Sequence, residues 1–411
     1  MLEKNEHCSI DPTFWLHRRV AVTNHTGFLG TWIASWLSEL GADAVGLSPN
    51  LAAAPAPGIL TWPERSIDSH ILDLRDRARV AQTIEALAPE VIIHLAADSA
   101  APGSGLKRPL EQFDSIAAGT LNLLEAARRV PRLRAALVVT SDSVYRPTAA
   151  PRREIDPLGA PTPRAASLAC AELIVQTFRH CYLSGEDGIG LASLRACMLV
   201  GGGDFTSGRV VPEIVRAIAA ARPPVLADPS SCPPFLHVLD ALHATLLLAQ
   251  AVARRPQHLA RPWNLAPPPS DAWPLSRIAE RLRARLGDAS PGAERPPPIA
   301  ALPPRLGAPG APLPPSAKLG ATNRLDGRAL AEALGWRPLL KPETALDWTA
   351  DGYRQLAATA EEGFIAEQIA LFRALTATPP EMAVDADLDH GRGIERLPMS
   401  QRKASHAATL A

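Results

Sequence analysis

The sequence predicts an α/β protein with a doubly wound parallel sheet and a smaller lobe towards its C-terminus. Short unbroken apolar runs suit buried parallel strands, and apolar residues at helical spacing lie between these runs. The first such unit occupies residues 18–50. It reads as an apolar strand at 20–22, a tight turn, a helix with apolar residues over 32–40, and a second strand. Gly41 is the expected end of the helix.

The turn after the first strand, TNHTGFLG, has the spacing of a Rossmann-type dinucleotide-binding loop. Gly27 stands where backbone must approach a pyrophosphate, and Gly30 where the helix must pack closely on the strand. The helix N-terminus would supply N–H donors and a positive dipole. Asn24 takes the place of a first glycine, and asparagine tolerates a positive φ better than most residues. The alternative is a first βαβ unit that holds no nucleotide. The candidate cofactor-binding residues of the loop are Asn24, His25, Thr26, Gly27, Phe28 and Gly30.

The same patterns predict the rest of the sheet and the helices that cover it. Apolar runs predict further strands at 70–74, 90–94, 135–139 and 190–200. Helical periodicity predicts helices at 77–87, 110–129 and 164–183. Short apolar stretches bounded by prolines follow at 235–240 and 263–265. Towards the C-terminus we expect helices at 328–335, 343–356 and 361–375.

The chain is expected to have four parts. Residues 1–17 form an N-terminal arm, and 18–190 form an NAD(P)-binding Rossmann domain. Residues 191–375 form a substrate lobe interleaved with returning elements of the Rossmann domain. This lobe includes the proline-dense segment 290–318, which is better interpreted as irregular or extended than as helix or strand. Residues 376–411 are polar without periodicity and are expected to be a disordered tail.

Composition and charge exclude several classes of function. The 42 Lys and Arg residues balance 42 Asp and Glu residues, so no global field favours nucleic acid or an anionic membrane. The N-terminus lacks the pattern of a signal peptide, and no uncharged apolar run reaches the roughly 18 residues of a membrane span. The five cysteines show neither C-x-x-C pairs nor zinc spacing. We therefore expect no metal and a reducing, cytoplasmic compartment.

From Phe14 onward the segment FWLHRRVAVTNHTGFLG resembles the start of CDP-glucose 4,6-dehydratases. These are extended short-chain dehydrogenases of the NAD-dependent epimerase/dehydratase family, in which a phenylalanine–tryptophan pair precedes a TGHTGFKG-type loop. Further blocks continue the resemblance as far as Leu375. They are HLAA at 94–97, CAEL at 170–173, FLHV at 235–238, WNL at 263–265 and LGW at 334–336.

The resemblance implies a nicotinamide cofactor. It places Asp73 and Leu74 beside the adenine, and it places the small residues Ala96 and Ala97 where backbone lies close to the cofactor. The second strand runs into Ser48 without the acidic residue that usually holds the ribose of NAD. It also lacks an obvious arginine for the 2′-phosphate of NADP. The choice between NAD and NADP is therefore left open.

The resemblance also implies a catalytic pair that this sequence lacks. Family members use a tyrosine whose pKa is lowered by a lysine four residues later, and this pair precedes a GCAEL block. Here Arg164 and Leu168 take the two positions, and no tyrosine elsewhere has a lysine four residues later. We therefore expect a degenerate active site. The polar residues kept at the end of the preceding strand are the candidate catalytic residues, Thr140, Asp142 and Tyr145.

Substrate-contacting positions are only partly kept. Arg209 and His237 match the family and are the candidate substrate-binding residues. Pro233 replaces an arginine that clamps the nucleotide diphosphate, Ser143 replaces a lysine that assists elimination, and Ile116 replaces a helix asparagine. The losses thus fall on chemistry-bearing positions, whereas glycines and apolar framework positions survive.

Three functions stay open on this sequence. The first is an NAD(P)-binding protein that acts on a nucleotide-sugar-like small molecule with altered or lost dehydratase chemistry. The second is a non-catalytic scaffold or partner subunit, as a homodimer or as a heterodimer with a related enzyme. In that case the helices at 110–129 and 164–183 would form the contact, as they do in the family. The third is a functional CDP-glucose 4,6-dehydratase.

Overall fold

The computed structural model describes residues 9–49, 67–96, 108–148, 150–159, 161–183, 188–287, 324–359 and 363–377. The chain divides into two compact units, Met1–Phe372 and Arg373–Ala411. The described part of the second unit is the C-terminal end of helix α15 (Gly363–Ala377). The predicted proline-dense segment at 290–318, and the predicted tail from residue 378 onward, lie outside the described residues. The contacts below all belong to the first unit.

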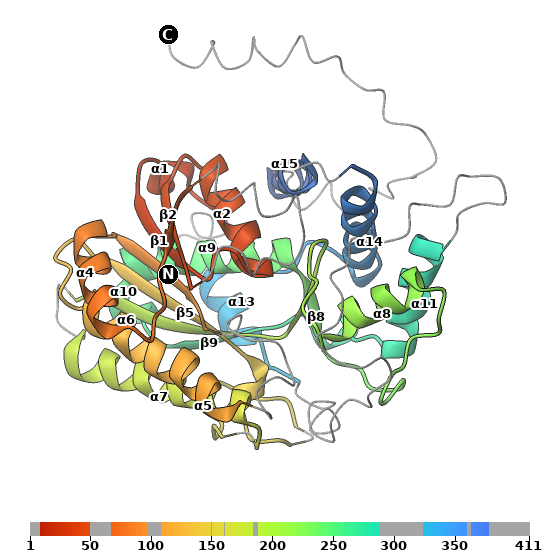
Figure 1. The fold of residues 1–411 in the computed structure, drawn as a ribbon, viewed down its shortest axis with the longest axis horizontal. Coiled ribbons are helices and arrows are strands. Elements are labelled where there is room, and N and C mark those ends of the chain that lie inside the picture. The colour runs from red at the N-terminus through yellow and green to blue at the C-terminus, as the bar shows by residue number, and fades with distance from the viewer. Residues whose placement is uncertain are drawn as a thin grey trace, which may run out of the picture. The chain divides into compact units, whose positions relative to one another are not determined.

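Seven parallel strands form the central sheet, in the order β3-β2-β1-β4-β5-β6-β9 (Figure 1). They are β1 (Arg19–Thr23), β2 (Asp43–Ser48), β3 (Asp68–Ile71), β4 (Val91–Leu95), β5 (Ala135–Ser141), β6 (Gly190–Ala196) and β9 (Pro262–Leu265). The strand order reverses between β1 and β4, which makes this point the switch of a doubly wound sheet. The central strands are buried on both faces, which explains their unbroken apolar runs. The predicted Rossmann-type sheet is confirmed.

Helices cover both faces of this sheet. They are α1 (Pro12–Trp15), α2 (Phe28–Glu39), α4 (Arg77–Leu87), α5 (Pro109–Gln112), α6 (Gly119–Ala127), α7 (Pro163–Tyr182), α9 (Val238–Arg254) and α10 (Pro256–Leu259). Helices α4, α6 and α7 lie together on one face, and α2 and α9 lie on the other (Figure 1). Side-chain caps fix four of these starts, among them those of α4 and α7. Asp76 accepts the N–H of Arg79 (3.1 Å), and Thr162 accepts that of Ala165 (3.3 Å).

One predicted strand is in fact two. The apolar run at 190–200 forms β6 and then β7 (Met198–Val200), and β7 pairs with β8 (Phe235–His237) in a separate two-stranded sheet. Cys197 lies between β6 and β7, and its N–H donates to the Leu265 carbonyl of β9 (3.0 Å). The chain leaves the central sheet at this residue. The sequence pattern at 190–200 does not reveal such a change of sheet, because β6 is buried throughout and β7 is buried or half-buried.

Two other predicted elements differ in detail. The predicted strand at 70–74 ends at Ile71, so Asp73 and Leu74 lie in the turn that follows. The predicted helix at 110–129 consists of α5, a π-helical segment η3 (Phe113–Ala118) and α6. A π-helical turn inside a longer helix is rare and often marks a functional site.

The C-terminal lobe is mainly helical. Its helices are α8 (Val210–Ala219), α11 (Leu275–Gly287) and α14 (Pro342–Thr359). Helix α13 (Arg328–Leu334) instead contacts β9 and α9. Helix α11 packs on α8 and α14. Arg281 of α11 binds Asp347 of α14 through two hydrogen bonds (2.7 and 2.6 Å), and Arg285 lies 3.2 Å from the same carboxylate. The sequence prediction missed α11, although its buried apolar residues recur at helical spacing.

Two glycines let α14 lie directly on the loop that follows β7. A Cβ atom on Gly202 would lie 2.6 Å from the Cα atom of Gly352, which is too close for any side chain. Trp32 of α2 donates its indole N–H to the Gly202 carbonyl (3.1 Å). The lobe and the first helix of the Rossmann domain therefore meet at one loop, where backbone touches backbone.

A buried carboxyl group holds the start of α14 against α9. Asp240 is fully buried and accepts the N–H groups of Leu339 (2.7 Å) and Leu340 (3.3 Å). Burial raises the pKa of Asp240 to about 7, although the two N–H donors lower it. The segment before α14 is thus fixed by a carboxyl group that titrates near neutrality.

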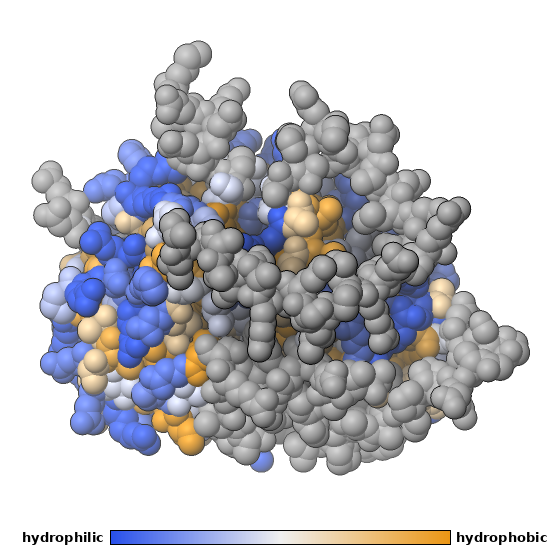
Figure 2. Space-filling view, turned by 90° about the horizontal axis from the view of Figure 1, so that it is seen from above, coloured by the Kyte–Doolittle hydropathy of each residue, from blue (hydrophilic) through white to orange (hydrophobic). Residues whose placement is uncertain are grey.

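The surface of the described part is mixed in polarity. In the view of Figure 2, hydrophilic residues cover most of the left part of the described surface, and apolar residues gather in small groups. Among the described helices, none is long and apolar enough to cross a membrane.

We expect the substitution Asp240→Asn to flatten the pH dependence of stability. The native pKa of about 7 lies above the ordinary value of 3.8, so the unfolded chain releases a proton that the native protein keeps between these values. The contribution of Asp240 to the free energy of unfolding therefore falls as pH rises from about 4 to about 7 and is constant above.

Urea unfolding at about pH 5 and about pH 8 measures the effect. The Asp240→Asn protein should lose less stability between these values than the wild type. Asp114→Asn, at an exposed position, is the matched control and should behave like the wild type. Equal pH dependence in all three proteins would contradict the prediction.

Candidate functional site

The turn between β1 and α2 has the geometry of a dinucleotide loop. Asn24 adopts a φ of 56°, as expected for the residue in place of the first glycine. Its N–H donates to the Leu47 carbonyl (2.6 Å), and its carbonyl accepts the N–H of Gly27 (3.0 Å). A Cβ atom on Gly30 would lie 2.2 Å from the Asn24 carbonyl oxygen. Only glycine therefore lets α2 begin this close to β1.

The N-terminus of α2 suits an anion. Gly27 is the N-cap residue, and as a glycine it has no side chain of its own to cap the helix. The first turn of a helix presents N–H groups and the positive end of the dipole, both of which favour a phosphate group. Phe28 begins the helix directly after this glycine. The loop thus fits the diphosphate of a dinucleotide.

The side chain of His25 links this loop to strands β2 and β3. Its ring is fully buried, with Nδ1 2.9 Å from the Ser48 hydroxyl and Nε2 3.0 Å from the Ser69 hydroxyl. The ring covers Gly46, where a Cβ atom would lie 2.3 Å from it. Burial lowers the pKa of His25 to about 4, so the ring is neutral. The Thr26 hydroxyl also donates to Ser48 (3.2 Å). His25 and Thr26 are therefore directed at strands β2 and β3.

The predicted adenine side lies at the same edge of the sheet. The Asp73 carboxylate is bound by the Arg75 guanidinium (Nε 2.9 Å and Nη2 2.6 Å), which lowers the pKa of Asp73. The Leu74 carbonyl accepts from the Asn122 side chain (2.8 Å). Ala96 is buried just after β4, whereas Ala97 lies outside the described residues. Contact of these residues with a cofactor stays a prediction.

A second buried histidine joins the first strand to the helix with the π-helical turn. The Thr23 hydroxyl lies 2.8 Å from His94 Nδ1, and His94 Nε2 lies 3.0 Å from the Thr120 hydroxyl, which donates to the Ile116 carbonyl (2.5 Å). Burial lowers the pKa of His94 to about 4, so the ring is neutral. Ile116 itself is fully buried and apolar. It cannot offer the polar group that the family's asparagine would bring to a substrate.

The two positions of the implied tyrosine–lysine pair lie in the first turns of α7. Leu168 is fully buried and apolar. Arg164 is half-buried and acts electrostatically on Asp142, which follows β5. Burial raises the pKa of Asp142 to about 6, and the Arg164 guanidinium limits this shift. Ser141 donates to Asp142 (3.3 Å). A carboxyl group with a pKa of about 6 thus lies at the carboxyl end of β5, within electrostatic reach of Arg164.

Thr140 and Tyr145 belong to a buried network instead. Thr140 donates to Glu172 of α7 (2.6 Å), and Glu172 forms an ion pair with Arg195 of β6 (2.7 Å). Arg195 donates to the Tyr145 hydroxyl (2.6 Å), which donates to the Asn264 side chain (2.7 Å). Burial raises the pKa of Tyr145 to about 12. The geometry therefore gives Thr140 and Tyr145 a structural role, and a catalytic role for either remains a prediction.

Sequence reasoning missed this network, although its members carry a signal. Glu172 is a charged residue on the buried side of α7, and Arg195 is a charged residue inside an apolar strand. Charges at buried positions are rarely left unpaired in native proteins. The sequence alone could therefore have suggested an ion pair between Glu172 of the helix and Arg195 of the strand that follows it.

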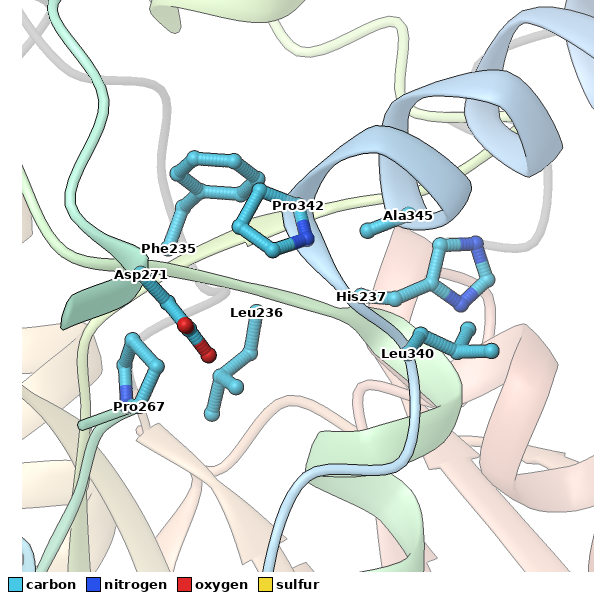
Figure 3. A pocket seen from close by; sticks show the side chains of 8 residues that line it. All are labelled: Phe235, Leu236, His237, Pro267, Asp271, Leu340, Pro342 and Ala345. Atoms are coloured by element: carbon cyan, nitrogen blue, oxygen red, sulfur yellow. The ribbon is translucent and has the colours of Figure 1, made fainter. Parts of the chain in front are cut away.

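Arg209 and His237 lie in the C-terminal lobe. Arg209 is half-buried and donates to Asp204 (3.2 Å). His237 is fully buried, its ring centroid lies 6.1 Å from that of Trp32 and 5.9 Å from that of Trp348, and its Nδ1 accepts the N–H of Leu239 (3.3 Å). Figure 3 shows the small cavity beside it, lined by Phe235, Leu236, His237, Pro267, Asp271, Leu340, Pro342 and Ala345. His237 thus caps α9 and fills the core, and substrate contact by His237 or Arg209 stays a prediction.

A parallel sheet of this order, with a glycine-containing loop at its switch point, defines a dinucleotide-binding α/β protein. Residues 20–266 match the NAD dependent epimerase/dehydratase family. The chain is 32% identical over 285 residues to the CDP-glucose 4,6-dehydratase of Salmonella typhimurium, a match that covers 68% of this chain and 79% of that protein. The chain belongs to the NAD dependent epimerase/dehydratase family.

Solved structures agree with the fold. An epimerase from Methanothermobacter thermautotrophicus matches with a TM-score of 0.66 at 18% identity, over 84% of this chain and 95% of that one. The dTDP-glucose 4,6-dehydratase DesIV from Streptomyces venezuelae, with NAD and TYD bound, matches with a TM-score of 0.64 at 20% identity, over 82% and 97% of the two chains. The prediction of a nicotinamide cofactor is thereby confirmed at the level of the family.

We expect Glu172→Ala to destabilise the protein by about 3–5 kcal/mol, because it would leave the Arg195 guanidinium buried without its carboxylate. Urea unfolding measures the loss. Glu111→Ala, which removes an exposed pair with Arg108, is the matched control and should change stability by no more than about 0.5 kcal/mol. Similar small losses in both variants would show that the network is not a main source of stability.

Proposed function

We propose that this chain binds NAD and a nucleotide-linked sugar, and that its dehydratase chemistry is altered or lost. The observation that carries the proposal is the pair of residues at the start of α7. Arg164 and the fully buried Leu168 stand where the implied mechanism needs a tyrosine and a lysine. A missing general base typically costs about 10²–10⁴ in rate.

The phosphate loop supports the first half of the proposal. Asn24, Gly27 and Gly30 keep the backbone path that a dinucleotide needs, and the N-cap residue Gly27 has no side chain of its own. These residues would hold the diphosphate of NAD, and the bound cofactor would supply a hydride acceptor. The fold neighbour from Streptomyces venezuelae was crystallised with NAD.

Asp142 supports the second half. Unlike Thr140 and Tyr145, it is not a member of the buried network around Glu172 and Arg195. Its pKa of about 6 suits proton transfer near neutral pH. As a carboxylate, above that pH, it would take a proton from a substrate, and below that pH it would give one. Proton transfer of this kind, without the tyrosine-dependent oxidation, is the altered chemistry that the site supports.

A non-catalytic partner subunit is the second candidate. Large apolar side chains are exposed along the helices that pack together on one face of the sheet, namely Leu110, Phe113, Leu121, Leu173 and Tyr182. Apolar side chains on neighbouring helices favour contact with another protein. A scaffold would need neither Arg164 nor Asp142 for chemistry.

A functional CDP-glucose 4,6-dehydratase is the third candidate. The relative from Salmonella typhimurium carries that name. This function would need a general base other than the missing tyrosine. The four described cysteines are free thiols, which supports a reducing, cytoplasmic compartment for all three candidates.

We expect calorimetric titration of nucleotide-free protein with NAD⁺ to show micromolar binding. The Gly30→Ala variant should abolish it, because the added Cβ would lie 2.2 Å from the Asn24 carbonyl oxygen. Gly363→Ala is the matched control, since a Cβ there meets nothing within 4 Å. Titration with NADP⁺ decides the nicotinamide form. No heat with either nucleotide at millimolar concentration would leave the scaffold as the working function.

We expect the double substitution Arg164→Tyr with Leu168→Lys to raise dehydratase activity by about 10²–10⁴, because it restores the general base and the cation beside it. The assay follows a 4-keto-6-deoxy product from CDP-glucose and NAD⁺. Each single substitution serves as a control and should recover far less. A folded double variant that binds NAD⁺ but turns over no faster than the wild type would place the loss of activity elsewhere.

A further inference from the structure

Arg152 carries a charge that is almost fully buried. Its side chain is 6% exposed, and its Nε and Nη2 atoms have no hydrogen-bond partner among the described residues. Burial of an unpaired charge is costly, so native proteins pair such groups or leave them to a ligand. A bound anion would therefore pair the unpartnered edge of this guanidinium.

The two unpaired atoms form one edge of the guanidinium. The Nε–H and Nη2–H bonds run side by side and match two oxygens of a carboxylate or phosphate. Other arginines of this chain give the same edge to a carboxylate, namely Arg75, Arg128, Arg281 and Arg328. In Arg152 this two-point donor is unused.

The backbone of Arg152 is fixed near the carboxyl end of β9. Its carbonyl accepts from the Asn264 side chain (2.9 Å) and from the N–H of Asp326 (2.7 Å), and its own N–H donates to the Arg324 carbonyl (2.7 Å). Ligands of α/β proteins bind outside the carboxyl ends of the parallel strands. Arg152 is thus held at the ligand-binding edge of the sheet.

The nearby carboxylates of these segments are engaged elsewhere. Glu154 accepts the N–H of Asn264 (2.9 Å), and Asp156 accepts the N–H of Arg153 (2.9 Å). Asp326 is bound by the Arg328 guanidinium (2.6 Å). Each of these three carboxylates therefore has another partner, and an external anion suits the unused edge of Arg152.

The cofactor's own diphosphate is too far away to be this anion. Strand β9 is four strand spacings from β1, whose loop suits the diphosphate of the dinucleotide. At about 4.8 Å per spacing, the two edges lie roughly 19 Å apart. The anion at Arg152 would belong to a second ligand.

We propose that Arg152 binds the diphosphate of the nucleotide-linked substrate. The proposal rests on the proposed function, which supplies a second ligand with a nucleoside diphosphate. Arg152 would then replace the arginine that the family resemblance implies for the nucleotide diphosphate, whose position is Pro233 in this chain. The chain would have moved its diphosphate contact from the lobe to the segment between β5 and α7.

Calorimetry of the full chain with CDP and with cytidine tests this. Arg152→Leu should weaken CDP binding about tenfold or more and leave cytidine and NAD⁺ binding unchanged, because only the charged two-point contact is removed. Arg152→Lys should keep part of the affinity. Arg153→Leu, at the exposed neighbouring position, is the matched control and should bind CDP like the wild type.

Two outcomes would overturn the inference. One is equal CDP affinity in the wild type and in Arg152→Leu. A raised melting temperature of Arg152→Leu in that case would show that the buried charge destabilises the fold and binds no ligand. The other is a wild type that binds NAD⁺ but not CDP at millimolar concentration. Failure to bind NAD⁺ would instead count against the proposed function, so the two failures are distinguishable.

Discussion

The ion pair between Glu172 and Arg195 holds together the half of the sheet where substrate chemistry would occur. It joins α7 to β6, and through Thr140, Tyr145 and Asn264 it extends to β5 and β9. A buried ion pair is stabilised when its remaining donors and acceptors are also satisfied. Thr140 and Ser193 donate to Glu172, and Arg195 donates to Tyr145 and to the Glu154 carbonyl. Among the described residues, only Nε of the Arg195 guanidinium has no hydrogen-bond partner in this network. The network fixes Thr140 at the end of β5, two residues before Asp142, and it fixes Glu172 in the middle of α7.

The two halves of the candidate site differ in what they require. The dinucleotide half is built from backbone, and its demands are conformational: a positive φ at Asn24 and no side chain at Gly30. The substrate half is built from side chains, and its demands are chemical. A chain can replace a tyrosine by Arg164 without disturbing the fold, whereas a side chain at Gly30 would push α2 off the sheet. The dinucleotide half therefore tolerates fewer substitutions than the substrate half.

The sequence was sufficient for most strands of the central sheet and for the loop between β1 and α2, because periodicity and glycine spacing are local signals. Helix α4 was predicted at its observed bounds, and Asn24 was expected to tolerate the positive φ that it adopts. The break between β6 and β7 was not predicted, since it depends on a bond from Cys197 to a strand far along the chain. The roles of Thr140 and Tyr145 were not predictable for the same reason, because their partners Glu172 and Asn264 come from distant segments.

The single residue between β6 and β7 makes the joint between the two sheets stiff. Cys197 leaves no linker, so any tilt of the two-stranded sheet must be absorbed by the few torsion angles around it, and the bond to the Leu265 carbonyl resists that tilt. Leu265 follows Asn264, whose side chain is held by Tyr145. A ligand that draws the two-stranded sheet towards the central sheet would therefore transmit its force through Cys197 and Leu265 to the hydrogen bond between Tyr145 and Asn264.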